Sequence, residues 1–222
     1  MAFSQKDNGG DIVETALLLQ GMLTVREYFS RPDPVEAEIR SCVDSIWRTV
    51  EWDWYTRGED VLYWHWSPDH GWDMNMQVTG WNEALIVYVL AASSPTHPIS
   101  RRVYDNGWAR NGEMLNGLKY LDVTLPLGPP YGGPLFFAHY SFLGLNPHGL
   151  SDAYADYWNQ NVAQTRINYK YCVENPKGWK GYSRNVWGLT ASDVPGGYAA
   201  SSPTEDTGTI APTAALSSFP YT

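Results

Sequence analysis

The strongest constraint on the fold is a pair of helix start signals near the amino terminus. Asp11 and Asp33 each stand three residues before a Glu, and Asp-x-x-Glu ahead of an apolar run is typical of a capped helix. The first signal opens residues 11–29, whose apolar residues cover nearly the whole helical circumference, so we expect this helix to be buried on most sides. The second opens an amphipathic helix over residues 34–50, whose solvent-facing side includes Glu36 and Arg40.

Most of the remaining pattern is also helical. Helices are expected over residues 81–92, 101–106, 135–143 and 151–173, with a helical turn near Val186 and a last helix that starts at Pro212 and is cut off by the chain end. Residues 61–66 and 72–78 predict a hairpin around a five-residue loop, and residues 118–127 a further extended segment. The sequence therefore predicts one mainly α domain over residues 1–222 with short β-hairpin insertions.

The composition of the chain limits the kinds of partner that it is expected to bind. The net charge of −9 disfavours binding to nucleic acid, because an acidic surface repels phosphate. No apolar stretch approaches the ~18 residues that a membrane span needs, and the start of the sequence shows no basic and apolar leader. We therefore expect neither a membrane partner nor a signal peptide in this chain. Cys42 and Cys172 match no metal or redox spacing; we expect free buried thiols, although a disulfide stays open.

Several familiar sites lack their motifs. The sequence contains no GxGxxG, Walker, HExxH or GxSxG pattern, and its five histidines include no pair at helical i, i+4 spacing. We therefore expect neither a metal site nor a cofactor.

Carboxylates among apolar residues are the remaining candidates for chemistry. Glu83 is expected in the first turn of an apolar helix, where burial would raise its pKa and make it a proton donor near neutral pH. A first-turn acid that complements the helix dipole explains Glu83 equally well. Asp11 and Glu14 can point to one side of their helix end, although an ordinary capping box has the same pattern.

Aromatic residues are in excess, at 14% of the chain with 11 Trp and 15 Tyr. Seven of them lie within thirty residues: Trp52, Trp54, Tyr55, Trp64, Trp66, Trp72 and Trp81. Aromatic faces suit the C–H faces of sugar rings, whereas the alternative is a Trp-rich core. Further acids, Asp193 and the Glu205-Asp206 pair, lie in a Gly/Ser/Pro-rich stretch over residues 178–209, either as part of a binding loop or as solvated loop acids.

Seven ordered runs carry a family resemblance: residues 8–16 (NGGDIVETA) with 18–21 (LLQG), 62–68 (LYWHWSP), 80–88 (GWNEALIVY), 91–97 (AASSPTH), 134–144 (PLFFAHYSFLG), 187–193 (WGLTASD) and 208–215 (GTIAPTAA). They resemble the bacterial glucoamylase-like domain family, which includes endo-β-1,2-glucanases and a domain of cyclic β-1,2-glucan synthases. The resemblance implies an (α/α)₆ toroid and inverting hydrolysis of a β-linked glucan, above all β-1,2-glucan. It also implies an oligo- or polysaccharide partner and a periplasmic or extracellular location.

The resemblance also implies roles for individual residues. Glu83 corresponds to the family's proposed general acid, and Asp11 and Glu14 match the acids opposite it. In this mechanism Glu83 protonates the leaving oxygen, while Asp11 activates water with Glu14 holding or relaying, which requires carboxyls about 6.5–9.5 Å apart. The candidate substrate-binding residues are Trp64, His65, Trp66, Trp72, Trp81, Asn82, His139, Tyr140, Asp193, Tyr198 and Asp206.

The length of the chain departs from a full toroid. Twelve helices of ~11–12 residues with loops of ~4–6 residues need about 190–200 residues. This chain of 222 residues also spends residues on a hairpin and long loops, so we expect a partial ring, incomplete at both ends. A non-catalytic carbohydrate-binding module and a transglycosylating domain of a glucan synthase remain alternatives, and the oligomeric state is open.

Overall fold

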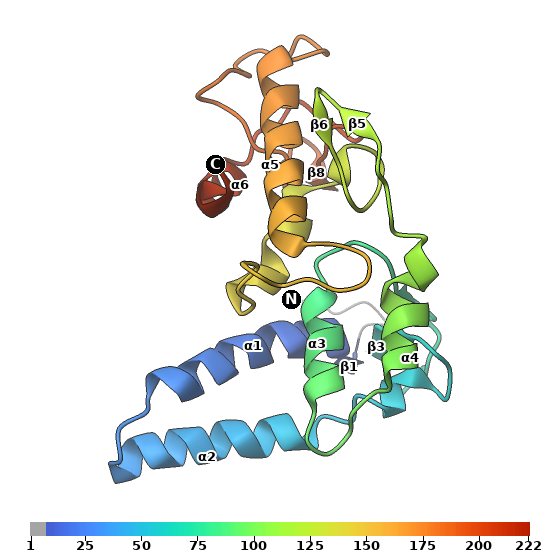
Figure 1. The fold of residues 1–222 in the computed structure, drawn as a ribbon, viewed down its shortest axis with the longest axis vertical. Coiled ribbons are helices and arrows are strands. Elements are labelled where there is room, and N and C mark those ends of the chain that lie inside the picture. Colours follow the sequence, from blue (N-terminus) through green and yellow to red (C-terminus); the bar gives the residue numbers. More distant parts are fainter. Residues whose placement is uncertain (1–7) are drawn as a thin grey trace. The chain divides into compact units, whose positions relative to one another are not determined.

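The computed structural model describes residues 8–222, and the chain folds into two compact units. Of the described residues, unit 1 comprises 8–80 together with Ala84–Asn111, and unit 2 comprises Trp81–Glu83 and Gly112–Thr222. The elements of unit 1 are β1 (Gly10–Asp11), α1 (Ile12–Tyr28), α2 (Pro34–Thr49), β2 (Leu62–Tyr63), β3 (His65–Trp66), β4 (Gln77–Val78), α3 (Leu85–Ser93) and α4 (Arg101–Val103) (Figure 1). Those of unit 2 are β5 (Lys119–Tyr120), β6 (Val123–Thr124), α5 (Tyr157–Glu174), β7 (Ala191–Val194), β8 (Gly197–Ala200) and α6 (Pro212–Ser217). The fold is mainly helical, as predicted.

Both predicted start signals cap helices. The Asp11 carboxylate accepts hydrogen bonds from the backbone N–H groups of Val13 and Glu14, and the Asp33 carboxylate accepts the equivalent pair in α2. These bonds satisfy N–H groups that have no partner inside the helix, which is why the helices begin at these residues.

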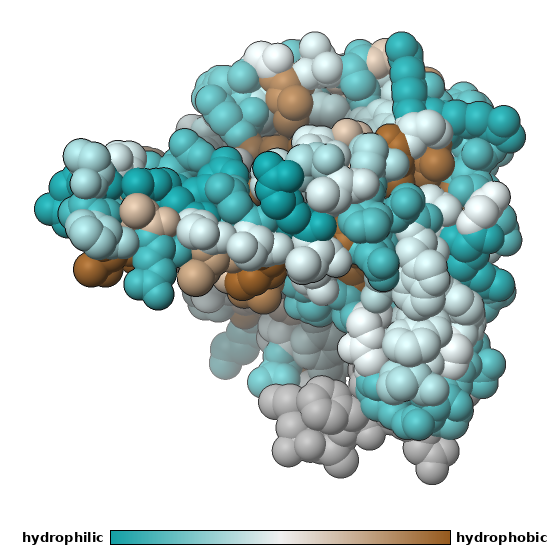
Figure 2. All heavy atoms as spheres, turned by 90° about the horizontal axis from the view of Figure 1, so that it is seen from below, coloured by the Kyte–Doolittle hydropathy of each residue, from teal (hydrophilic) through white to brown (hydrophobic). Residues whose placement is uncertain are grey.

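The prediction that α1 is buried on most sides is wrong for its second half. Its buried residues end at Gln20, and Leu18 is 61% exposed. Together α1 and α2 form an open apolar groove of about 780 Å³, lined by Leu17, Leu18, Gly21, Met22, Val25, Val35, Glu38, Ile39, Cys42 and Val43. Hydrophobic side chains gather along one side of this helix pair in Figure 2. The core of unit 1 thus covers only the first turns of α1.

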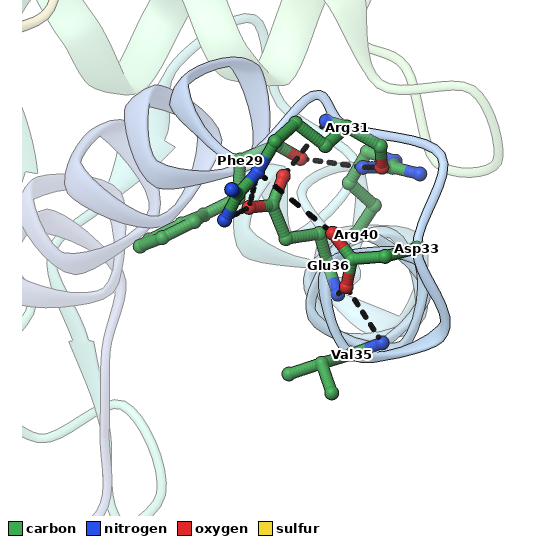
Figure 3. Close-up of polar contacts among 6 residues, drawn as sticks. All are labelled: Phe29, Arg31, Asp33, Val35, Glu36 and Arg40. Atoms are coloured by element: carbon green, nitrogen blue, oxygen red, sulfur yellow. Dashed lines mark hydrogen bonds and ion pairs between the residues drawn. The ribbon is translucent and has the colours of Figure 1, made fainter.

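An ion-pair network closes the turn between α1 and α2 (Figure 3). Glu36 accepts the backbone N–H of Arg31 at 2.7 Å and its guanidinium at 2.6 Å, and Arg40 donates to the carbonyl of Phe29. The Arg31 guanidinium holds the pKa of the Glu36 carboxyl below its usual range. Glu36 is buried in this turn, so its predicted place on the solvent-facing side of α2 is wrong.

The first strand of the predicted hairpin pairs with two different strands. β2 pairs with β4, whereas β3, two residues further on, pairs antiparallel with β1, so that Asp11 lies opposite His65. Trp64 stands at the change of partner, with its N–H bonded to Met76 and its carbonyl to Ile12. This pairing ties the start of α1 to the aromatic stretch around residue 65.

The hydroxyl of Tyr88 links α3 to this small sheet. It donates to the carbonyl of Val78 at 2.8 Å and accepts the N–H of Leu62 at 3.1 Å, thereby joining β4 and β2. Tyr88 is fully buried, and burial raises its pKa above the usual range. Helix α3 itself begins at Leu85 rather than at the predicted residue 81, because residues 81–84 form a turn after Gly80, whose φ is +75°.

In unit 2, α5 begins six residues later than predicted, at Tyr157. Residues 151–156 form a turn in which Asp152 accepts the N–H groups of Tyr154 and Ala155, and Asp156 then caps the helix. Asx turns of this kind compete locally with helix, and a periodicity argument overlooks them.

Helix α5 buries amides rather than a purely apolar stripe. Gln160, Gln164 and Asn168 are fully buried and follow one another at i, i+4 spacing. Gln160 bonds both the N–H and the carbonyl of Leu127, and Asn168 does the same for Leu189. Gln164 donates to the carbonyl of Pro134 and accepts the indole N–H of Trp81. The helix thus satisfies the buried backbone of three loops.

The other short elements are only partly as predicted. Residues 119–124 form the hairpin β5–β6, and α4 continues into a π-helical turn over Tyr104–Trp108. Residues 135–143 form two 3-10 helices, Leu135–Ala138 and Tyr140–Leu143. Two predictions are wrong: Val186 lies in a β-bridge, and α6 ends at Ser217, before Thr222. Residues 191–200 form the hairpin β7–β8, which the sequence pattern did not predict.

The two cysteines are free but differ in exposure. Cys172 is buried, as predicted, and burial raises its pKa to about 11. Cys42 is exposed on α2, so its predicted burial is wrong. Among the helices of residues 8–222, none has the length and apolar character to cross a bilayer.

We predict that Gln164→Leu destabilises the protein by about 2–4 kcal/mol, because it leaves the buried Trp81 indole N–H and the Pro134 carbonyl without partners. Urea denaturation measures the loss. The control is Gln77→Leu, which removes one bond from an exposed glutamine to the Tyr63 hydroxyl and should cost less than about 1 kcal/mol. Equal losses in the two variants would contradict the structural role of Gln164.

Stability should also fall in mild acid because of His139. Its Nε2 lies 3.0 Å from the Ser218 hydroxyl, and burial lowers its pKa from 6.5 to about 4. Between these values the unfolded chain binds a proton that the folded chain excludes, so the contribution is complete above about pH 6.5 and is lost as pH falls toward 4. The loss amounts to about 3 kcal/mol. In His139→Gln the pH slope of the unfolding free energy should flatten over this range, whereas the exposed control His70→Gln should keep it.

Candidate functional site

The head of α1 brings two of the predicted acids together. Asp11 ends strand β1, and its carboxylate is held by three donors. One oxygen accepts the backbone N–H groups of Val13 and Glu14 at 2.9 Å, and the other accepts the indole N–H of Trp64 at 2.9 Å. Asp11 is therefore fixed in position by its cap and by Trp64.

Glu14 lies one turn along and differs from Asp11 in its surroundings. Its side chain is exposed, and desolvation together with the negative charge of Asp11 raises the pKa of its carboxyl. A carboxylate with a raised pKa is the stronger base. Glu14 thus combines exposure with a raised pKa, whereas both oxygens of Asp11 are engaged by donors.

Tyr55 lies against Gly10, the residue that precedes Asp11. Its hydroxyl abuts Gly10, where a Cβ would collide with it, so a larger residue at this position of β1 would have to displace the Tyr55 ring. Burial and the charge of Asp11 raise the pKa of Tyr55 to about 12, so its hydroxyl keeps its proton at neutral pH. His65, predicted to bind substrate, is 2% exposed and lies in β3 opposite Asp11.

A cluster of indole rings lies beside these residues in unit 1. Trp54 contacts Trp66 at 5.4 Å and Trp72 at 4.8 Å between ring centroids. The Arg57 guanidinium stacks over Trp72 at 5.5 Å and over Tyr63 at 4.3 Å. Trp54 is 43% exposed, whereas Trp66 and Trp72 are half-buried. The structure thus groups two of the predicted sugar-binding residues around a more exposed one.

Glu83 belongs to unit 2 and is half-buried, as is its neighbour Asn82. It lies two residues before α3 rather than in its first turn, and its backbone carbonyl accepts the Ser141 hydroxyl. The predicted position of Glu83 inside the helix is therefore wrong, whereas its role as an acid that complements the helix dipole stays a prediction, since Glu83 directly precedes the N-cap Ala84.

Trp81 is 5% exposed. Its ring stacks on Tyr157 at 6.0 Å between ring centroids, with Phe142 at 6.4 Å, and its indole N–H donates to Gln164. These contacts make Trp81 a core residue of unit 2.

The other predicted residues of unit 2 differ in their exposure to solvent. His139 is 8% exposed, bonds Ser218 and stacks on the ring of Tyr221, while its neighbour Tyr140 is exposed. Asp193 and Tyr198 lie directly opposite each other in the hairpin β7–β8, and both are exposed. Only Tyr140, Asp193 and Tyr198 of this group present their side chains to solvent.

Asp206 is buried and saturated by donors. Its carboxylate accepts the Tyr182 hydroxyl at 2.6 Å, the Tyr171 hydroxyl at 3.1 Å, the Trp179 indole N–H at 2.9 Å and the backbone N–H of Gly208 at 3.0 Å. Burial, and then the charge of Asp206, raises the pKa of both tyrosines above the usual range. Asp206 thus fastens α5 to the long loops that follow it. Among the described residues no group of three His, Cys, Asp or Glu side chains is arranged to hold a metal.

Trp54 and Tyr55 stand out in the sequence only as part of the aromatic excess, and Gln164 does not stand out at all. A local signal exists for Tyr55: the Gly-Gly that precedes Asp11 marks a close backbone approach, although not the side chain that makes it. Nothing local marks Gln164, because its partners lie 30 and 83 residues away in the sequence.

Three known proteins resemble the chain closely. A solved "putative glucoamylase" from Bacteroides uniformis ATCC 8492 is 54% identical, with a TM-score of 0.97 over all of this chain and 54% of its own. An endo-β-1,2-glucanase from Chitinophaga pinensis, solved with sophorotriose and glucose, is 51% identical, with a TM-score of 0.96 and the same coverage. An exo β-1,2-glucooligosaccharide sophorohydrolase (non-reducing end) from Parabacteroides distasonis is 46% identical over 99% of this chain and 33% of its own length. The chain thus spans about half of the two solved proteins and a third of the curated one.

The family model described as "Putative glucoamylase" matches residues 75–222, the greater part of the chain. The match includes Glu83 and all of the predicted site residues that follow it. The chain belongs to this Glycoamylase family.

Proposed function

We propose that this chain provides catalytic residues of a glycoside hydrolase that cleaves β-1,2-linked glucan with inversion of configuration. The observation that carries the proposal is the acid pair at the head of α1, in which Asp11 is immobilised by three donors and Glu14 has a raised pKa. The printed names of two relatives, an endo-β-1,2-glucanase and a β-1,2-glucooligosaccharide sophorohydrolase, support the choice of substrate.

The mechanism assigns one proton transfer to each side of the sugar. Glu83 donates a proton to the leaving glycosidic oxygen, and a water on the opposite face attacks the anomeric carbon while it loses a proton to a carboxylate. We assign that acceptor role to Glu14, since the Asp11 oxygens are engaged by backbone and indole N–H groups. Asp11 then acts through its charge, which raises the pKa of Glu14, and through the position of the helix head.

The proposal includes an (α/α)₆ toroid, to which this chain contributes a part. The mainly helical fold and the antiparallel pair α1–α2 are compatible with such a ring, and the greater length of the relatives leaves room for its remaining helices. A periplasmic or extracellular location, which the family resemblance implies, belongs to the same proposal. Recovery of the protein in the cytoplasmic fraction of its own host would count against that location.

We predict that Glu83→Gln lowers kcat on linear β-1,2-glucan by about 10²–10⁴-fold, because the amide cannot protonate the leaving oxygen. A reducing-sugar assay measures the rate, and NMR of the first product measures its anomeric configuration. Glu113→Gln, at an exposed glutamate of unit 2, is the control and should keep the full rate. A Glu83→Gln variant that keeps most of its activity would remove the acid assignment, and a retained configuration would exclude the inverting mechanism.

The same assay separates the alternative functions. Binding of glucan with no new reducing ends in the unmodified protein indicates a carbohydrate-binding module. Redistribution of chain lengths without a net gain of reducing ends indicates a transglycosylase.

Asp11 and Glu14 should respond differently to neutralisation. Glu14→Gln should abolish the acidic limb of the kcat/KM profile along with most of the activity. Asp11→Asn preserves a good helix cap but removes the charge that raises the pKa of Glu14, so the acidic limb should move to lower pH. A pH–rate profile of each variant measures this, and an unmoved limb in Asp11→Asn would contradict the coupling.

A further inference from the structure

A second feature of unit 1 is a cavity of about 470 Å³ that opens beside the acid pair. Its walls come from the head of α1, the end of α2, the 3-10 helix Trp54–Thr56 and β3. The lining residues are Gly10, Ile12, Thr15, Val50, Glu51, Trp54, Tyr55 and Trp66. Neither Asp11 nor Glu14 lines it, so the cavity adjoins the acids without containing them.

The aromatic wall is rigid before any ligand arrives. Trp54 is braced edge-on by Tyr55 at 5.3 Å and by Trp66 at 5.4 Å, with Trp72 tilted against it at 4.8 Å. Trp72 is held in turn by Arg57, whose guanidinium also donates to Asn75 at 2.7 Å. A large ring that stays 43% exposed while three others fix it is a preformed surface, so binding costs it little side-chain entropy.

The polar groups of the cavity suit hydroxyls rather than charges. The Thr15 hydroxyl gives its proton to the Asp11 carbonyl at 2.6 Å, which leaves its oxygen lone pairs for a donor. The exposed carboxylate of Glu51 also accepts hydrogen bonds. Acceptors beside an aromatic face, with no cation among the lining residues, favour a neutral polyol ring over an anion.

Backbone continuity connects the cavity to the acids. Gly10 lines the cavity and Asp11 follows it in β1, and the Tyr55 hydroxyl abuts Gly10. The cavity wall and Asp11 therefore share the backbone of β1.

We propose that this cavity is a subsite for one glucosyl ring of the β-linked glucan chain, with Trp54 as its platform and with Thr15 and Glu51 as hydroxyl acceptors. The proposal rests on the proposed function for the identity of the sugar. The subsite adds a binding position to those that the predicted substrate-binding residues imply.

The test is the affinity for sophorotriose, measured by isothermal titration in the Glu83→Gln background so that turnover does not interfere. Trp54→Ala should raise the Kd at least tenfold, whereas Trp54→Phe, which keeps an aromatic face, should stay within about threefold. In the otherwise unmodified enzyme, Trp54→Ala should raise KM with little change in kcat, because a platform that takes no part in proton transfer binds ground and transition states alike. Tyr28→Ala, which removes an exposed ring at the far end of α1, is the control and should leave Kd and KM unchanged.

The outcomes separate the subsite from the function. Unchanged affinity in a folded Trp54→Ala variant, as judged by near-UV circular dichroism, overturns the subsite even if the protein hydrolyses glucan. Binding that Trp54→Ala abolishes, without hydrolysis by the unmodified protein, keeps the subsite and overturns only the hydrolase proposal. Failure of the unmodified protein to bind sophorotriose or longer β-1,2-gluco-oligosaccharides overturns both.

Discussion

Unit 2 depends on the need to satisfy the buried backbone of its long irregular segments. A buried peptide group without a partner costs about 1–3 kcal/mol, and these segments make few strand ladders that could supply one. Three amides of α5 provide the partners instead. Gln160 and Asn168 each bond both the N–H and the carbonyl of one loop residue, as a neighbouring strand would. Gln164 lies between them and donates to the carbonyl of Pro134, a residue that has no N–H to give in return. The amide oxygen of Gln164 therefore accepts the indole N–H of Trp81 instead.

This arrangement explains which parts of the fold the sequence could predict. Helix caps at Asp11 and Asp33 are local, since the donor and the acceptor lie within three residues, and both were predicted correctly. The burial of α5 could not be inferred from hydrophobic periodicity because its buried face carries Gln and Asn at helical spacing. The pairing of the divided hairpin could not be inferred from local pattern either, since the partner of His65 is Asp11, more than fifty residues away.

Local sequence pattern also predicts the candidate site only in part. Local pattern identified Asp11 and Glu14, but only the structure distinguishes a carboxylate occupied by three donors from one whose pKa is raised, first by desolvation and then by the charge of Asp11. Position in the sequence does not separate Asp193 from Asp206 either. Both lie in the Gly/Ser/Pro-rich stretch, yet Asp193 is exposed on a hairpin and Asp206 is enclosed by two tyrosines, an indole and a glycine N–H.

The tryptophans show why an aromatic excess predicts a class of ligand better than it predicts a site. Trp52 and Trp81 are buried, so their large apolar area stabilises the two units. Trp64 is half-buried and uses its N–H to hold Asp11, which is a positioning role that an apolar residue could not fill. Trp54 alone of these four is both largely exposed and fixed by neighbouring rings, and it lines a cavity beside the acids. An indole can thus be buried in the core, hold an acid by its N–H or stay exposed against other rings, and its neighbours in space decide which.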